Sequence, residues 1–417
     1  MEKAVEFIIN SYLSSPKKSK LDYLDNLLFS LLFEKEARML KKSKSKGIGE
    51  IEGLLNRYYD YRNMLYKKIL AFHPGKESKL VKDIYIPPDR LVFLLTHNCQ
   101  LRCKYCRVRK FAASMDRNVL FKGIDLLLTS NADELQMQFF GGEPLLNYGL
   151  LKKGVEYVNK SSLNNRKAVS FLLTTNGIEL TKEKVDFFRK HGFTVEFSID
   201  GEVKSQLCSR KSSNGTNYYS KMLNNFNYLK KSRVPYYSIS VFMPENVSSM
   251  FDNFVSLVNA GFERLQINYA LGVFWDKKAS TMLFTQTRRV IDFVRKHKNI
   301  EFVNLSSMRK EPVVLNAELT LDCDGGIYLE SGICLEEDFA AMKDKFKVSN
   351  IKTAKNINLL STTAFRNFYN LSMVYGKANP LFRKIIVNNI KLGSEYERLL
   401  KYEQDRQGYS SYKVLSC

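Results

Sequence analysis

The sequence of 417 residues contains no apolar run long enough to span a lipid bilayer, which argues against a membrane protein. A secretory signal is also missing, because the N-terminal stretch MEKAVEFIINSYL has the spacing of an amphipathic helix with acidic residues early. We therefore expect a globular protein in the cytoplasm, where cysteine thiols stay reduced. Apolar residues make up 44% of the sequence, which is enough for a sizeable core.

Acidic residues are scarce, since 43 Asp and Glu stand against 65 Lys and Arg, and the formal net charge is +22. Such an excess favours polyanions or acidic peptides as partners. Much of it lies on lysine-rich helix faces such as residues 182–191, which are typical of a solvated surface. No RNP1 motif, KH loop or helix-turn-helix pattern occurs, so nucleic acid is not the expected partner.

Cysteine is also sparse, yet three of the seven cysteines, Cys99, Cys103 and Cys106, stand together at the spacing C-x3-C-x2-C. They follow the apolar run Leu91–Leu95, which predicts a buried strand that ends in a loop. Iron–sulfur clusters are held by cysteine thiolates, and three thiolates on a four-iron cluster leave one iron open. The spacing therefore indicates a cluster with an iron available for chemistry.

Zinc is the alternative metal for these cysteines, with His97 as a fourth ligand. Structural zinc sites usually add a second pair of cysteines further along the chain, and no such pair follows closely. A disulfide is disfavoured, because three clustered cysteines leave one over and nothing indicates export.

Strand-like and helix-like stretches alternate six times between Leu91 and Leu271, which predicts a parallel sheet with right-handed crossovers. The strand candidates are LVFLLT, ELQMQFFG, VSFLLTTN, TVEFSID, YYSISVFM and RLQINYAL. In βα barrels the chemistry lies at the carboxyl ends of the strands. Those ends carry the cysteine loop, Gly141–Pro144, Thr175–Gly177 and Ser198–Gly201.

Two motifs connect this pattern with a known family. Tyr105 directly precedes Cys106, and GGEP follows the strand-like run Leu135–Phe140. Together they resemble the signature C-x3-C-aromatic-C and the GGEP motif of radical S-adenosylmethionine (SAM) enzymes. The resemblance implies an α/β fold, a partial (β/α)6 barrel, in which Cys99, Cys103 and Cys106 hold a [4Fe–4S] cluster. SAM would chelate the fourth iron, and one electron would split it into a 5′-deoxyadenosyl radical that abstracts hydrogen.

The resemblance also implies where SAM binds. Glycines at the GGEP motif allow a close backbone approach, and Glu143 with the Gly142 carbonyl would accept hydrogen bonds from the SAM ammonium. Ser198 and Asp200 would bind its ribose or carboxylate, and Arg210 would pair with the carboxylate. The expected SAM-binding residues are Tyr105, Gly141, Gly142, Glu143, Pro144, Asn176, Ser198, Asp200 and Arg210.

The chain divides into three predicted parts. Residues 1–88 read as a helical segment that either covers the open side of the barrel or docks a leader peptide, and residues 89–275 form the barrel. Residues 276–417 form a small α+β extension with helices, similar to a degenerate SPASM or twitch domain. Its cysteines, Cys323, Cys334 and Cys417, are either three ligands of an auxiliary cluster, completed by Asp322, Asp324 or substrate, or ordinary cysteines.

The motif set most resembles the subgroup of radical SAM enzymes that mature peptides and proteins. We therefore expect hydrogen abstraction from a peptide or protein, with an acidic leader attracted by the positive charge and an electron donor such as flavodoxin or ferredoxin. The substrate would lie between the open mouth of the barrel and the segment after Leu271. The alternatives are a nucleotide or small-molecule substrate and, in another class, a zinc-stabilised basic protein that binds nucleic acid.

Overall fold

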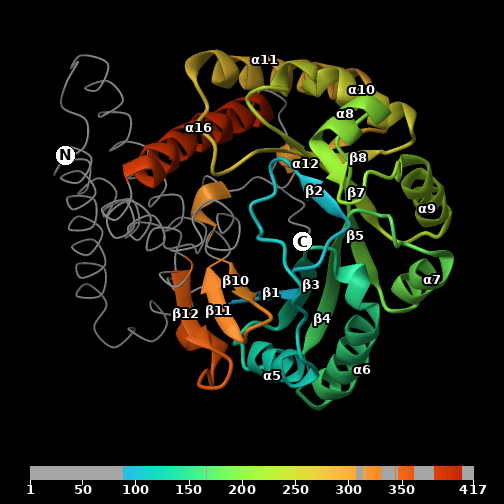
Figure 1. Ribbon diagram of the computed structural model, residues 1–417, viewed down its shortest axis with the longest axis vertical. Helices are drawn as coiled ribbons and strands as arrows, with labels where there is room; N and C mark the ends of the chain where they lie inside the picture. Colours follow the sequence, from blue (N-terminus) through green and yellow to red (C-terminus); the bar gives the residue numbers. More distant parts are fainter. Residues whose placement is uncertain are drawn as a thin grey trace. The chain divides into compact units, whose positions relative to one another are not determined.

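The computed structural model describes residues 88–165, 167–306, 313–316, 318–329, 343, 346–360 and 380–405. The predicted helical segment 1–88 lies outside this part of the chain except for Pro88, and so do Cys334 and Cys417. Figure 1 shows the arrangement of the described elements, which keep its labels below.

Six parallel strands form the centre of the sheet, in the order β1-β3-β4-β5-β7-β8, and β9 (Glu301–Phe302) extends it in parallel. Each of the six matches a strand expected from the sequence, whereas β9 was not expected. The bounds are Arg90–Thr96 for β1, Glu134–Gly141 for β3, Ala168–Thr175 for β4, Phe193–Ser198 for β5, Tyr236–Phe242 for β7 and Arg264–Tyr269 for β8.

Helices follow the strands and lie around the outside of the curved sheet (Figure 1). They are α5 (Arg117–Leu128), α6 (Tyr148–Asn165), α7 (Lys182–Lys190), α9 (Tyr219–Lys231), α10 (Met250–Asn259) and α11 (Lys277–Lys296). Shorter pieces η1 (Pro144–Asn147), α8 (Val203–Ser209) and η2 (Val247–Ser249) sit in the connections. The predicted α/β fold with six βα units is confirmed. None of the described helices is long and apolar enough to cross a bilayer.

The sequence explains why β1 lies inside the sheet and not at its edge. Its residues from Leu91 onwards are buried, as a strand covered on both faces requires. Phe93 lies opposite Phe139 of β3, and further phenylalanines continue the packing, with Phe171 of β4 stacked on Phe193 of β5 at 4.9 Å between ring centroids. This apolar layer fixes the strand ends that carry the polar motifs.

The strands of the C-terminal part join the same sheet. β10 (Leu319–Leu321) pairs in parallel with β1, and β11 (Gly326–Leu329) and β12 (Lys347–Asn350) follow in antiparallel pairing. The turn between β10 and β11 contains Gly325 at a φ of 78°, so the glycine turn expected from DGGIYL is present. β10, which follows the predicted division between residues 275 and 276, shares one sheet with β1, which precedes it. The division itself stays a prediction.

The remaining described elements of the C-terminal part are helical. They are α12 (Val303–Ser306), η3 (Val313–Leu315), η5 (Ile357–Leu360) and α16 (Pro380–Asp405). α16 is bound to the segment after β8, because the Asn389 side chain accepts a hydrogen bond from the Gly272 amide at 2.9 Å and donates to the Val273 carbonyl at 2.8 Å.

Candidate functional site

The loop that carries the three cysteines begins where β1 ends and is clamped by a distant segment. Its short strand β2 (Leu101–Cys103) pairs antiparallel with β6 (Arg210–Ser212), which places Cys103 opposite Arg210. Backbone hydrogen bonds continue the ribbon at both ends, from Lys104 to Ser209 and from Ser213 to Gln100. The loop is therefore held in one conformation from outside the cysteine motif.

The three thiols are available as ligands of a cluster. Each is half-buried and free of a disulfide. Hydrogen bonds point at the sulfurs, from the Leu101 amide to Cys99 at 3.4 Å and from the Lys110 ammonium to Cys106 at 3.0 Å, and such bonds help to set the potential of iron–sulfur clusters. Burial raises the pKa of the Cys103 thiol to about 12, so bound metal is needed to keep it as a thiolate. The donor set fits a cluster with three cysteine ligands.

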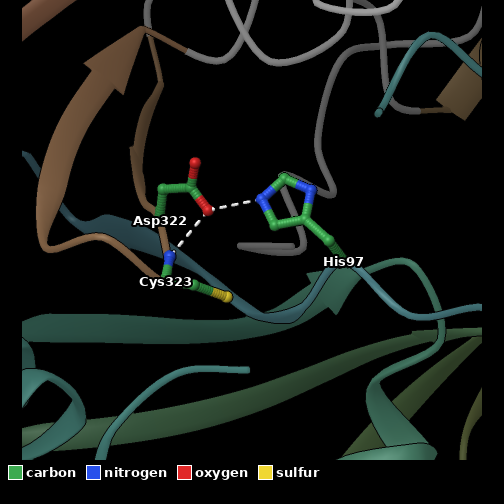
Figure 2. A group of neighbouring side chains, drawn as sticks. All are labelled: His97, Asp322 and Cys323. Atoms are coloured by element: carbon green, nitrogen blue, oxygen red, sulfur yellow. Dashed lines mark hydrogen bonds and ion pairs between the residues drawn. The ribbon is translucent and has the colours of Figure 1, made fainter. Parts of the chain in front are cut away.

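His97 does not complete a zinc site with these cysteines, because both of its ring nitrogens are already bound. Nδ1 lies 2.8 Å from the Arg109 carbonyl oxygen, and Nε2 lies 2.8 Å from the Asp322 carboxylate. Figure 2 shows the imidazole directed at Asp322. The reading of the cysteine motif as a zinc centre with His97 as ligand therefore has no support in the geometry.

The glycines of GGEP make the close backbone approach that their residue type predicts, and they make it to the cysteine loop. Gly141 has a φ of 134°. A Cβ atom at Gly142 would lie 2.1 Å from the Asn98 carbonyl oxygen. The Gly142 amide donates to the Thr96 carbonyl at 2.7 Å, and the Glu143 amide donates to the Asn98 carbonyl at 2.8 Å. GGEP thus fixes the start of the cysteine loop, and any side chain at Gly142 would displace it.

Glu143 is fully buried and joins the end of β3 to the end of β4. Its Oε1 accepts hydrogen bonds from the Leu145 amide and the Thr175 hydroxyl, and its Oε2 accepts from the Asn176 amide. Burial raises the pKa of the Glu143 carboxyl to about 7, in spite of these three donors. Asn176 continues the chain of contacts, because its Nδ2 lies 3.9 Å from the Cys99 sulfur.

Asp200 and Arg210, both expected to contact SAM, are paired with each other. The guanidinium donates from Nε and Nη2 to the two carboxylate oxygens, each at 3.0 Å, and both side chains are buried. The Tyr105 hydroxyl donates to the same carboxylate at 2.8 Å, and the guanidinium lies 5.3 Å from the Tyr105 ring centroid. These three residues lock the aromatic position of the cysteine motif, a role that sequence reasoning missed. Whether they also contact SAM stays a prediction.

Other predicted residues lie around the same strand ends. Pro144 begins η1 directly after Glu143, and Ser198 ends β5 with no side-chain hydrogen bond to the rest of the described chain. A cavity of about 350 Å³ opens beside Cys99. Phe111 and Leu146 line it with 44% and 46% of their surfaces exposed, so the cavity has an apolar rim.

The residues expected at an auxiliary cluster are engaged with protein partners where the structure describes them. The Cys323 thiol donates to the Leu94 carbonyl at 3.1 Å, and Asp322 binds His97 and Lys343. Asp324 accepts from the Gly326 amide and the Tyr328 hydroxyl. Cys334 and Cys417 lie outside the described residues, so the auxiliary cluster stays a prediction.

Comparison with known proteins places the described strands and the cysteine loop in a known family of domains. Residues 93–258 match the model of the radical SAM superfamily. These residues form a radical SAM domain. They contain the cysteine motif, GGEP and the Asp200–Arg210 pair, and the predicted resemblance to the radical SAM superfamily is confirmed.

Relatives of the domain include a cyclopropyl synthase and a sulfatase-maturating enzyme. The radical SAM cyclopropyl synthase TigE of Paramaledivibacter caminithermalis is 20% identical over 249 residues, which cover 48% of this chain and 50% of TigE. A serine-type anaerobic sulfatase-maturating enzyme of Bacteroides thetaiotaomicron is 29% identical over 153 residues, 34% of this chain and 36% of that enzyme. This chain therefore spans about half the length, or less, of these curated relatives.

A solved structure shares the fold over most of its length. Native anSMEcpe with bound AdoMet and Cp18Cys peptide superposes with a TM-score of 0.59 at 20% sequence identity, covering 76% of this chain and all of that one. The likeness supports the partial barrel architecture.

Proposed function

We propose that this chain is a radical SAM enzyme that abstracts a hydrogen atom from a peptide or protein substrate, in the course of maturing it. The observation that carries the proposal is the cysteine loop itself, whose three thiols lie at the carboxyl end of β1 and are fixed by GGEP on one side and by β6 on the other. The alternative of a zinc site is disfavoured, because both ring nitrogens of His97 already have protein partners.

With three cysteines as ligands, a [4Fe–4S] cluster would supply one electron to SAM on its open iron, giving methionine and a 5′-deoxyadenosyl radical that takes a hydrogen atom from substrate. The chain's own residues prepare the site. Lys110 and the Leu101 amide donate to the sulfurs, and their positive ends offset the charge of the thiolates. The Ser198 hydroxyl and the remaining lone pair of Glu143 would bind the polar groups of SAM.

Glu143→Gln should weaken SAM binding by at least about tenfold while the iron content stays unchanged. The substitution removes the negative charge that would pair with the SAM ammonium, and a charge-assisted hydrogen bond is worth about 1.5–3 kcal/mol. Glu143→Gln is preferred to a change at Gly142, which would displace the cysteine loop. SAM affinity is measured by equilibrium binding to the reconstituted protein at a pH above the Glu143 pKa of about 7, so that the wild-type carboxyl is ionised.

Glu134→Gln is the matched control, because Glu134 lies exposed at the other end of the same strand. It should leave SAM affinity unchanged. Equal affinities of wild type, Glu143→Gln and Glu134→Gln would remove Glu143 from the SAM pocket.

The proposed substrate is a peptide with an acidic leader, delivered to a cytoplasmic enzyme that is reduced by a flavodoxin or ferredoxin. The net charge of +22 supports an acidic partner, since it would speed encounter and make binding sensitive to salt. The relatives support a protein substrate, because sulfatase maturation acts on a protein. The exposed Phe111 and Leu146 beside Cys99 would suit an apolar side chain of that peptide.

The substrate class is tested by isotope transfer. The peptide encoded nearest to this gene is produced fully deuterated and incubated with the reduced enzyme and SAM, beside deuterated nucleotides in a parallel reaction. We expect deuterium in 5′-deoxyadenosine only with the peptide, and less turnover as salt is raised. Deuterium transfer from the nucleotides and none from the peptide would assign the enzyme to the alternative substrate class.

A further inference from the structure

The β10–β11 turn reaches the cysteine loop through one buried hydrogen bond. Because β10 runs parallel to β1, with Phe93 opposite Leu321, the residue after Leu321 emerges at the same edge of the sheet as the cysteine loop. That residue is Asp322, whose Oδ1 lies 2.8 Å from Nε2 of His97. Both side chains are 1% exposed, and 225 positions of sequence separate them.

His97 in turn fixes the cysteine loop at two further points. Its Nδ1 binds the carbonyl of Arg109, beyond the last cysteine of the motif, and its backbone amide donates to the Ala113 carbonyl at 2.9 Å. Its ring stacks on Phe111 at 4.2 Å between centroids. His97 therefore joins the two ends of the cysteine loop and supports the aromatic rim of the cavity beside Cys99.

A metal ion is one reading of this cluster, since the ligand atoms of His97, Asp322 and Cys323 lie within 4.8 Å of one another (Figure 2). The other contacts oppose it. The ammonium of Lys343 occupies the second oxygen of Asp322, and the Cys323 thiol donates to the Leu94 carbonyl. The Lys343 ammonium already occupies the carboxylate oxygen that a metal ion would need. His97, Asp322 and Cys323 therefore each have a protein partner in the absence of a metal ion.

We infer that Asp322 is a positioning residue, which holds His97 and through it the cysteine loop and Phe111 in the conformation that receives the cluster. This inference rests on the proposed function. A histidine whose two nitrogens both face acceptors keeps its orientation only while both acceptors remain. Loss of Asp322 would remove the carboxylate that binds the buried His97 ring, so the ring would turn and the loop would loosen.

The test compares Asp322→Ala and Asp322→Asn with Asp324→Asn, a matched control in the same turn. The exposed Asp324 carboxylate is hydrogen-bonded to the Gly326 amide and the Tyr328 hydroxyl, and no bond to His97 is found among the described residues. For Asp322→Ala we expect iron release to a chelator about tenfold faster than in wild type, the lower end of what outer-sphere changes cost metal sites. The electron paramagnetic resonance spectrum of the reduced cluster should broaden. Asp322→Asn, which keeps one acceptor, should fall between, and Asp324→Asn should match wild type.

Hydrogen exchange of the full-length apoprotein separates this inference from the proposed function. The His97 amide should exchange faster in Asp322→Ala than in Asp324→Asn, whether or not the chain takes up a cluster. Absence of a cluster in wild type would count against the proposed function alone. If Asp322→Ala fails to fold, Asp322→Asn supplies the comparison. Equal iron release, spectra and exchange in the Asp322 and Asp324 variants would overturn the inference.

Discussion

Replacing Cys99, Cys103 and Cys106 together with alanine should abolish formation of 5′-deoxyadenosine by the reduced protein. The three thiols are the only ligands that the loop offers to a cluster within the part of the chain that the structure describes, and no SAM is cleaved without it. Anaerobic reconstitution should give wild type with four irons and four sulfides per cluster site and the triple variant with none at this site. The product is measured by mass spectrometry after addition of reductant.

Cys208→Ala is the control for this experiment. Cys208 is exposed on α8, and its sulfur accepts a hydrogen bond from Lys104 at 3.5 Å, so it lies beside the motif without belonging to it. The variant should keep its iron and its product. Undiminished 5′-deoxyadenosine from the triple variant would falsify the assignment of the cluster to this loop.

The fold could be predicted because its signals are local. Each strand of the barrel is a short apolar run that ends in polar or glycine residues, and the runs recur with helical stretches between them. The cysteine spacing and GGEP sit directly at two of these strand ends. Right-handed parallel connection then brings those ends to one edge of the sheet, which is how sequence alone located the site.

The contacts that hold the site could not be predicted, because they join distant segments. The parallel pairing of β10 with β1 is not visible in either strand, and it alone brings Asp322 to His97. The sequence also placed Asp200 and Arg210 at the site without showing that a buried carboxylate there would take the nearest guanidinium as its partner. Local patterns thus identified which residues gather, and the tertiary structure decided which of them bind one another.

Arg210→Ala should lower the free energy of unfolding of the apoprotein by about 3–5 kcal/mol, the cost of leaving a buried charge without its partner. Asp200 would keep the Tyr105 hydroxyl and the Val241 amide as donors but would lose both hydrogen bonds from the guanidinium. Arg210 lies opposite Cys103 in the paired strands β2 and β6, so loss of its side chain would also weaken the support of this pair beside Cys103. Urea unfolding followed by circular dichroism measures the loss, and iron uptake should fall with it.

Two further variants decide whether the loss comes from the buried pair. The double variant Asp200→Asn with Arg210→Met removes both charges together, so it should cost less than Arg210→Ala alone. Arg189→Ala breaks an exposed ion pair, in which the Arg189 side chain is 59% exposed and the Asp186 side chain 45%. It should lower the free energy of unfolding by less than about 1 kcal/mol. If Arg210 served mainly to pair with the SAM carboxylate, Arg210→Ala would be as stable as Arg189→Ala and would lose only SAM affinity. That result would contradict the role of Arg210 as the partner that keeps Asp200, Tyr105 and the cysteine loop in place.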